Sequence, residues 1–496
     1  MKKIKNLYIV VFNVKNLNFM SHFPKIFNYL TCSLFIYISF LLSSCEKSEK
    51  SKIYSDEVKT LISYVQDKSK FNFSVVDTIK YDGALLYRVK MNSGEWLTKE
   101  IVDEPNWWHW VDIVIPNKID TSTSFLFIGG GSKFDNNLFL DSLTIQKAIE
   151  TKSIVTHVSN IPFQPLNFHS NDTIYRYEDN LIAYGWDKFL KGGAKKDDVE
   201  WLARFPMTRA VVRAMDVVQK ITSEEKYAVQ DFFISGASKR GWTTWTTAAV
   251  DKRVIGMAPL VIDLLNIIPS FEHHYQLYGD WSPAVKDYVD FGIMDWMKTK
   301  EFENLLKYVE PFQFKHLFTM PKLIVNGTID EFFATDSWKF YWDEIPEKKY
   351  LQYVPNGNHG LTTGSYQLKN IFSFYNRLIH SQELPEMIWH IENDTFHVNV
   401  GKDTPHQIHL WKINNPNTRD FRIWEVGRNW KNTLVNYKES GKYEIEVPVG
   451  EGFTASLVEI IFYPDSENPV TLTTGTRVLP DKYLHAPYDS SQKEKF

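Results

Sequence analysis

A serine at position 238 stands where a buried strand gives way to a segment that can form a helix. The apolar residues 231–235 predict the strand, and Gly236 and Ala237 are small enough for a tight turn before the serine. This layout is typical of a nucleophile elbow, which exposes a serine hydroxyl at the end of a parallel sheet. The usual spacing is G-x-S-x-G, whereas Gly241 comes one residue late here. The match alone therefore leaves an ordinary turn open.

An acid and a histidine follow the serine in the order that a hydrolytic triad requires. Residues 323–325 predict a second buried strand ahead of Asp330, and residues 350–354 predict a third ahead of His359. Open α/β sheets place their sites at the carboxyl ends of strands, so we expect the three side chains to meet there. In such a trio the imidazole takes the proton of the weakly nucleophilic serine, and the carboxylate orients the imidazole. The sequence predicts Ser238 as nucleophile, Asp330 as acid and His359 as base.

A second aspartate competes with Asp330 for the role of triad acid. Asp263 follows the apolar residues 260–262, and some hydrolases carry the acid one strand earlier in the chain. If Asp263 is not the acid, its place after a strand favours a structural capping role. Glu331 and Asp336 follow closely on Asp330, and we expect them at the surface or in capping positions. The spacing leaves both acids open, with Asp330 as the preferred prediction.

A run of glycines upstream of the serine could supply an oxyanion hole. Residues 125–128 predict a strand, and Gly130 and Gly131 lie in the loop that follows it. Glycines there let backbone N–H groups approach a developing oxyanion, and the N–H of Lys239, directly after the serine, would be the second donor. A phosphate-binding loop is excluded because the chain has no G-x-x-x-x-G-K-[ST] motif. A plain tight turn is the other interpretation of the glycine run.

The histidines and cysteines of the chain do not indicate a metal-binding or redox site. His273 and His274 look like a zinc pair, but adjacent residues of a regular helix point to different sides and cannot bind one ion together. We therefore expect a solvated or substrate-facing role for both. The two cysteines, Cys32 and Cys45, lie in the N-terminal segment, which leaves the rest of the chain without thiolates or disulfides. Neither a metal nor a cofactor is expected.

The composition is that of a large globular protein and gives no sign of nucleic-acid binding. The 496 residues predict two or three domains with a sizeable buried core. The formal net charge is only -4, and no basic stripe is present that could attract a phosphate backbone. Aromatic residues make up 15% of the chain, which favours an aromatic-rich core over a carbohydrate-stacking surface.

The first 45 residues have the character of a targeting signal. Lysines precede the apolar residues 29–42, and Met20 offers a second start that gives a compact signal peptide. The signal ends in Leu-Ser-Ser-Cys at Cys45, which resembles a bacterial lipobox, and the polar residues 46–57 would form a tether. This pattern predicts an exported lipoprotein of the bacterial cell envelope, held on the membrane by a lipid on the cysteine. A conventionally cleaved signal peptide or an uncleaved anchor helix is the alternative.

Alternating strands and helices predict an α/β-hydrolase domain over residues 58–385. Short strands in residues 58–116 predict an antiparallel start, and the alternation that follows predicts a doubly wound, mostly parallel sheet. Residues 205–220 and 368–379 carry apolar side chains at helical spacing. Residues 265–320 are rich in aromatic side chains, show no strand alternation and predict a helical cap over the site.

The sequence changes character towards its C-terminal end. Short strands at residues 396–400, 443–447 and 456–463 are separated by Asn, Gly, Pro and Asp turns. Residues 386–485 are therefore predicted as a small antiparallel β-sandwich domain, and residues 486–496 as a tail. The expected fold class is an α/β protein with an α/β-hydrolase domain, a helical cap and a C-terminal β-sandwich.

The chain resembles the PhoPQ-activated pathogenicity-related protein family in several stretches of the predicted hydrolase domain. The resemblance implies an exported protein of the α/β-hydrolase fold with a C-terminal β domain, and some members are described as secreted growth-repressing signals. The turn is also similar to that of glucuronoyl esterases, G-C-S-R-x-G, with Lys239 in place of the oxyanion-assisting arginine and Ala237 as a departure. The resemblant stretches are residues 181–184, 186–189, 206–216, 236–242, 262–266, 330–333 and 355–359.

Three hypotheses about function follow from these residues. Ser238 would form an acyl-enzyme with a small-molecule, peptide or carbohydrate ester, which makes a carboxyl-ester hydrolase the preferred function. A peptidase of the same fold shares the nucleophilic step and is the first alternative. A secreted or surface protein that keeps the fold for signalling or binding, without turnover, is the second.

Overall fold

The computed structural model describes residues 54–135, 142–169, 173–223, 228–362 and 366–490 of the chain. The predicted signal peptide, Cys45 and most of the predicted tether lie outside the described residues. In the part of the chain that the structure describes, no helix is both long enough and apolar enough to cross a membrane.

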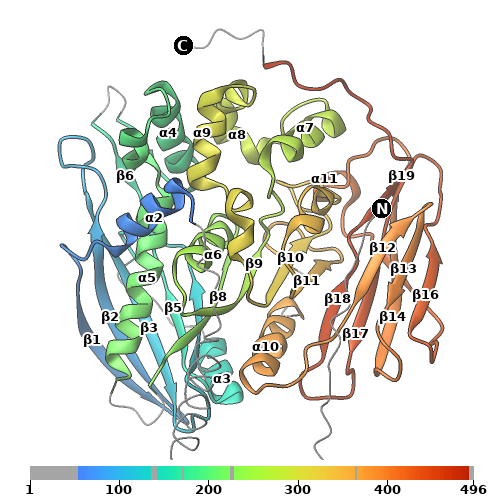
Figure 1. The fold of residues 1–496 in the computed structure, drawn as a ribbon, viewed down its shortest axis with the longest axis horizontal. Helices are drawn as coiled ribbons and strands as arrows, with labels where there is room; N and C mark the ends of the chain where they lie inside the picture. Colours follow the sequence, from blue (N-terminus) through green and yellow to red (C-terminus); the bar gives the residue numbers. More distant parts are fainter. Residues whose placement is uncertain (1–53, 136–141, 170–172, 224–227, 363–365, 491–496) are drawn as a thin grey trace, which may run out of the picture. The chain divides into compact units, whose positions relative to one another are not determined.

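A nine-stranded sheet forms the centre of the fold, in the order β1-β2-β3-β5-β4-β8-β9-β10-β11 (Figure 1). Pairing is antiparallel from β1 through β2 and β3 to β5 and parallel from β5 onwards, which confirms the predicted sheet. The strands are β1 (Asn72–Tyr81), β2 (Ala84–Glu95), β3 (Asn106–Pro116), β4 (Thr123–Ile128), β5 (Val155–Val158), β8 (Asp231–Ala237), β9 (Val254–Leu260), β10 (Lys322–Gly327) and β11 (Lys349–Val354).

The strand order changes direction between β4 and β8. The chain leaves β4 to form β5 on one side of it and returns to form β8 on its other side. Open α/β sheets bind their ligands outside the carboxyl ends of the strands at such a switch point. Gly130 and Gly131 follow β4 and Ser238 follows β8, so the predicted oxyanion loop and nucleophile lie at this position.

Helices cover both faces of the sheet because alternate strand residues point to opposite sides. In β8, Phe232 and Ile234 join a buried cluster with α5 and α6, whereas Phe233 joins a second cluster with α3 and α10. The predicted helices at residues 205–220 and 368–379 are α5 and α10. The helices and short elements are α2 (Asp56–Gln66), α3 (Ser142–Thr151), β6 (Leu166–Asn167), β7 (Tyr175–Arg176), α4 (Glu178–Lys191), η1 (Lys196–Trp201), α5 (Arg204–Ile221), α6 (Lys239–Val250) and α10 (Tyr366–Ile379).

The start of the hydrolase domain differs from the predicted run of strands. Residues Asp56–Gln66 form the helix α2, with the Ser55 hydroxyl accepting from the Val58 N–H as an N-cap. Val58, Leu61 and Val65 recur at helical spacing and are buried. A helix with one apolar side can pack against α5, which α2 contacts, and that contact decides for helix over strand.

The segment between β9 and β10 is helical, as predicted for residues 265–320. Figure 1 shows α7, α8 and α9 near one another, and α8 and α9 contact α4. The elements are α7 (Ile267–Tyr278), η2 (Pro283–Val285), α8 (Lys286–Asp290), η3 (Ile293–Trp296), α9 (Lys300–Val309) and η4 (Pro311–Leu317), with η5 (Ser337–Phe340) and η6 (Trp342–Glu344) after β10.

The C-terminal residues form two antiparallel sheets, as predicted for this part of the chain. One sheet has the order β12-β13-β16, and the other has β15-β14-β17-β18 with β19 also paired to β17. Inward side chains of both sheets, such as Phe396 and Ile460, belong to one buried cluster. The elements are β12 (Ile388–Glu392), β13 (Thr395–Asn399), β14 (His406–Asn415), α11 (Ile423–Val426), β15 (Lys431–Leu434), β16 (Lys442–Glu446), β17 (Phe453–Phe462), β18 (Val470–Thr473) and β19 (Arg477–Leu479).

The C-terminal sheets are hydrogen-bonded to the last elements of the hydrolase domain. The backbone N–H of Tyr353 in β11 donates to Thr473 Oγ1 at 2.9 Å. Asn370 in α10 donates to the Thr471 carbonyl at 2.8 Å and accepts from the Thr471 N–H at 2.7 Å. Residues Tyr54–Phe496 accordingly cluster as one compact unit.

Candidate active site

Ser238 is the one residue between β8 and α6, and its backbone is held in an unusual conformation. Its dihedral angles are φ 56° and ψ -125°, which L-residues rarely adopt and which is typical of a strained nucleophile elbow. The turn needs both of its glycines. A Cβ on Gly236 would lie 2.8 Å from the Arg240 carbonyl oxygen, and one on Gly241 would lie 2.8 Å from that of Leu260. The late glycine is therefore needed for the close approach of α6 to the end of β9.

His359 joins Ser238 to Asp330 in a continuous chain of hydrogen bonds. Its Nε2 lies 2.9 Å from Ser238 Oγ. Its Nδ1 lies 2.9 Å and 3.0 Å from the two carboxylate oxygens of Asp330. With the proton on Nδ1, the imidazole donates to Asp330 and accepts from the serine hydroxyl, which is the tautomer that a general base needs.

The loop that carries Asp330 also shapes the surroundings of His359. Asp330 Oδ1 accepts the backbone N–H groups of Phe332 at 2.7 Å and Phe333 at 3.3 Å. The ring of Phe332 lies 4.0 Å from the imidazole between centroids. Glu331 accepts the backbone N–H of His359 at 2.7 Å. The acid loop thus fixes both the ring and the main chain of the histidine. Glu331, expected at the surface or in a capping position, is half-buried and holds the backbone of His359.

Residues of the loop between α11 and β15 brace the histidine loop from outside. Asn356 exchanges two hydrogen bonds with the backbone of Trp430, at 2.9 and 3.1 Å. Arg428 donates to the Asn356 carbonyl and, at 2.6 Å, to Thr362 Oγ1. The Asn356–Thr362 loop that presents His359 is therefore held by side chains and backbone far along the sequence.

Asp263, the rival acid, meets other partners. Its carboxylate is buried and accepts hydrogen bonds from the hydroxyls of Tyr341, at 2.7 Å, and Tyr353. Both ring nitrogens of His359 are already bonded, to Asp330 and Ser238. Burial raises the pKa of Asp263 to about 7, against the lowering effect of the two tyrosines. This geometry favours Asp330 over Asp263 as the triad acid.

The glycine loop after β4 packs closely beside the serine turn. The carbonyls of Gly130 and Gly131 accept from the Asn160 N–H at 2.7 Å and from Gln164 Nε2 at 2.8 Å. A Cβ on Gly130 would lie 2.6 Å from Arg240 Nη2, so this position has no room for a side chain. Lys239 is the first residue of α6, where backbone N–H groups have no acceptor within the helix. These amides stay the predicted oxyanion donors.

The two cations after Ser238 share an ion-pair partner on α4, Glu178. Lys239 Nζ lies 2.8 Å from Glu178 Oε2 and 3.0 Å from Asp179 Oδ2. Arg240 forms a bidentate ion pair with Glu178 and also donates a hydrogen bond to the Ile161 carbonyl. Although burial raises it, the pKa of Glu178 falls to about 2 because Arg240 and Lys239 stabilise the charge. The ammonium of Lys239, expected in place of an oxyanion-assisting arginine, lies in these ion pairs instead.

The ion pairs of Glu178 with Lys239 and Arg240 were not predicted from the sequence, and a local signal for them is hard to find. Glu178 lies 62 residues before Arg240 in the chain, so no spacing rule connects them. Its backbone has φ 49°, a conformation uncommon for residues other than glycine. Its N–H donates to Gln164 Oε1 at 2.7 Å, which helps to hold that conformation.

A narrow cavity lies beside Ser238 under the helical segment that follows β9. Its volume is about 30 Å³. A cavity needs roughly 10–15 Å³ to hold one water molecule, so this cavity admits only a small group. Its apolar walls include Trp186, Trp242, Ile262, Leu264, Phe271 and Phe332.

Comparison with known proteins assigns the chain to a family. The family model of the PhoPQ-activated pathogenicity-related protein matches residues 61–422, which include Ser238, Asp330 and His359. The chain belongs to this family. The match extends beyond residue 385 into the C-terminal sheets, which agrees with the close hydrogen bonding between the two parts.

One curated relative and two solved structures illustrate what the chain is similar to. Autocrine proliferation repressor protein A of Dictyostelium discoideum is 35% identical over 390 residues, which cover 75% of this chain and 77% of that protein. Acetyl xylan esterase 1 of a Thermoanaerobacterium species is 12% identical, with a TM-score of 0.45 over 65% of this chain and 94% of the esterase. The glucuronoyl esterase of Solibacter usitatus is also 12% identical, with a TM-score of 0.38 over 67% of this chain and 93% of that one.

His273 and His274, on α7, are buried in this family member, so the expectation of a solvated or substrate-facing role is wrong. His273 Nε2 lies 2.7 Å from Asp336 Oδ1, and His274 Nε2 accepts the Ser282 N–H at 3.0 Å. Asp336 also pairs with Arg419 at 2.8 Å, so it is a buried ion-pair partner and not a surface group. These polar contacts account for both histidines structurally.

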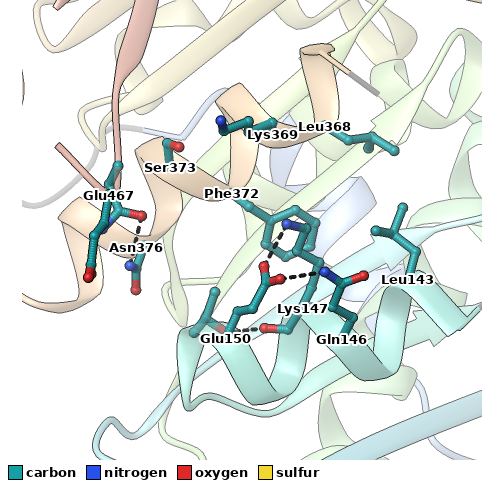
Figure 2. A pocket seen from close by; sticks show the side chains of 12 residues that line it. Leu143, Gln146, Lys147, Glu150, Leu368, Lys369, Phe372, Ser373, Asn376 and Glu467 are labelled. Atoms are coloured by element: carbon teal, nitrogen blue, oxygen red, sulfur yellow. Dashed lines mark hydrogen bonds and ion pairs between the residues drawn. The ribbon is translucent and has the colours of Figure 1, made fainter. Parts of the chain in front are cut away.

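A second pocket, of about 530 Å³, lies between α3 and α10. Figure 2 shows Glu150 on its wall, bonded to Gln146 at 2.6 Å and to Lys147 at 2.7 Å. On the other wall Asn376 donates to Asn468 at 3.0 Å. Among the described residues that line this pocket there is no histidine to act as a general base.

Proposed function

We propose that this protein is a serine hydrolase that cleaves a carboxylic ester through an acyl-enzyme. Ser238 Oγ attacks the ester carbonyl carbon while His359 Nε2 takes its proton, and Asp330 stabilises the imidazolium. The N–H groups of Lys239 and of Gly130 or Gly131 donate to the oxyanion. The C–O bond to the alcohol then breaks, and the alcohol leaves with the proton from His359. Water, activated by the same imidazole, hydrolyses the acyl-enzyme.

The single observation that carries this proposal is the hydrogen-bonded chain from Asp330 through His359 to Ser238. Each link is 2.9 to 3.0 Å long, within the range over which a proton can pass directly. The strained turn at Ser238 supports it, because backbone strain of this kind collects where a side chain has a chemical task.

A fluorophosphonate probe tests for the nucleophile. Wild-type protein should be labelled covalently, whereas Ser238→Ala should not, and Ser238→Ala or His359→Ala should lower kcat by at least about three orders of magnitude. Ser69→Ala is the matched control, because Ser69 is an exposed serine bonded to Asp67 but to no imidazole. Labelling that survives Ser238→Ala in folded protein would overturn the proposal.

The small cavity beside Ser238 supports an ester with a short acyl group. If it receives the acyl chain, kcat/KM should be higher for p-nitrophenyl acetate than for the octanoate. Phe271→Ala removes part of the cavity wall and should shift the ratio towards the octanoate. Equal rates for both esters in the wild type would contradict this assignment. A peptide panel tests the alternative of a peptidase.

A non-catalytic signalling role is the second candidate function. It is favoured by the name of the relative from Dictyostelium discoideum, which describes a repressor of proliferation. The two functions separate cleanly: a signalling protein should keep its effect on cell proliferation in the Ser238→Ala variant, whereas an enzyme acting through hydrolysis should lose it.

Export and membrane anchoring are part of the same proposal. They are supported by the apolar segment ahead of Cys45 and the lipobox-like Leu-Ser-Ser-Cys sequence. Cys45→Ser should move the protein from the membrane fraction to the soluble fraction of the cell envelope. Unchanged fractionation would count against a lipid anchor.

A further inference from the structure

The hairpin of β12 and β13 brings two histidines to face each other on the C-terminal sheets. Its turn is Asn393-Asp394, with φ 46° and 59°, the positive values that a two-residue type I′ turn requires. A turn of this kind fixes the register, which pairs Glu392 with Thr395 and His390 with His397. The two imidazoles stack at 4.7 Å between centroids, with their planes 7° apart.

Glu392 joins the two histidines on the outer face of the hairpin. Side chains two residues apart on a strand share a face, so His390 and Glu392 point the same way. Trp389 precedes His390, and Ile391 lies between His390 and Glu392. Both point to the other face, where they are partly buried against the hydrophobic core. The potential ligand atoms of His390, Glu392 and His397 all lie within 4.8 Å of one another.

The neighbouring strand β16 adds negative charge beside this group. Glu444 lies opposite His397 in the register, and its carboxylate is 3.9 Å from His397 Nδ1. Glu446 lies two residues further on the same face, opposite Thr395. Carboxylates next to a ligating imidazole orient it and raise its basicity, so Glu444 is suited to the role of an outer partner.

We propose that His390, Glu392 and His397 bind a divalent transition-metal ion of the zinc type. Two imidazoles and one carboxylate are ligands that zinc takes, and hard ions such as Mg²⁺ prefer oxygen-only sites. With zinc bonds of about 2.0–2.2 Å, tetrahedral ligands lie roughly 3.4 Å apart, so the ligand atoms must approach one another by up to about 1.4 Å. The exposed side chains of His390 and Glu392 can rotate to do so. Water completes the coordination. This site is independent of the proposed function at Ser238.

Zinc titration of the untagged full-length protein tests the site by calorimetry, after metal removal with a chelator. The wild type should bind one zinc ion more per chain than the double variant His390→Ala/His397→Ala. His380→Ala is the matched control, because the two ring nitrogens of His380 bond to Asp120, at 3.0 Å, and to the Asn376 carbonyl, at 2.9 Å, and the residue lies outside the cluster. This control should bind zinc like the wild type. Glu444→Gln should weaken binding about tenfold, the usual loss of an outer partner.

A second readout separates binding from misfolding. The variants alter side chains that are exposed or half-buried at the surface, so their melting temperatures without metal should stay close to that of the wild type. Zinc should raise the melting temperature of the wild type and of His380→Ala but not that of the double variant, since only a ligand-binding native state is stabilised. Equal zinc uptake by the wild type and the double variant, or an equal loss in His380→Ala, would overturn the proposal. Magnesium binding in place of zinc would do so as well.

Discussion

Asp330 and Asp263 occupy equivalent places after neighbouring strands and yet have different chemistry. Each lies three residues beyond the end of its strand, Asp330 after β10 and Asp263 after β9, and both are buried. Asp330 meets an imidazole, whereas Asp263 meets the hydroxyls of Tyr341 and Tyr353. The position after a strand brings a carboxylate to the site, and its partners decide what it can do there.

The two aspartates differ in their hydrogen-bond donors. Asp330 accepts from His359 and from the backbone N–H groups of Phe332 and Phe333. Asp263 has only hydroxyl donors in a dry environment, and burial raises its pKa to about 7. A triad acid must be charged to stabilise the imidazolium, so the raised pKa of Asp263 counts against that residue in this role.

The largest expected difference is in turnover. Asp330→Asn should lower kcat about 10⁴-fold because the wrong tautomer of His359 is then favoured. Asp263→Asn should change kcat by less than tenfold, since its partners are tyrosines. Steady-state kinetics on an activated ester would measure both. The reverse outcome would make Asp263 the acid and break the comparison.

Stability as a function of pH should single out Asp263. Its carboxyl is protonated below about pH 7 in the folded state and only below about 3.8 in the unfolded state. Its stabilising contribution is therefore complete below pH 3.8 and is lost as the pH rises to 7, by a few kcal/mol at most. Urea unfolding across this range should show a smaller fall for Asp263→Asn than for the wild type. Parallel curves would contradict the raised pKa.

The hydrogen bonds from Arg428 to the histidine loop should affect turnover, because they position the imidazole that pairs with Asp330. Arg428→Ala removes the bonds to Asn356 and Thr362, and we expect a loss of about 10- to 100-fold in kcat through a misplaced imidazole. Arg477→Ala is the control, because Arg477 pairs with Asp394 and Asp481 away from this loop. If both variants lose activity equally, the bracing contacts are not specific.

The smallest effect is expected at the tyrosines. Tyr341→Phe deletes one hydrogen bond to Asp263 and should cost about 1–2 kcal/mol of the free energy of unfolding. Because Tyr341 does not touch the triad, kcat should stay near that of the wild type. Thermal melting and ester turnover, measured on the same preparation, would detect a departure from either expectation.

The sequence was informative where function follows from the ends of strands. Ser238, Asp330 and His359 each follow an apolar run, and the topology of a parallel sheet brings such loops to one edge. The helices α5 and α10 were predictable from spacing for the same reason, since one packed face leaves a periodic trace in the sequence.

Contacts between distant segments could not be predicted in this way. Tyr341 and Tyr353 reach Asp263 across 78 and 90 residues, so its neutralising environment has no local signature. His273 and Asp336 were expected near solvent, because polar side chains usually are, and their mutual pairing allows both to be buried. The helix α2 was not predicted, because its apolar side is stabilised only by packing against α5, which is distant in the sequence.

The brace from Arg428 and Trp430 has a consequence for the timing of biosynthesis. A chain emerging from the ribosome carries Ser238, Asp330 and His359 well before these two residues are made. Domains generally fold as they emerge, N-terminal parts first. The outer hydrogen bonds of the histidine loop can nevertheless form only after Arg428 and Trp430 have been synthesised. A nascent or prematurely terminated chain would thus hold all three residues in an unbraced loop, so hydrolytic activity would mature only with the last part of the polypeptide.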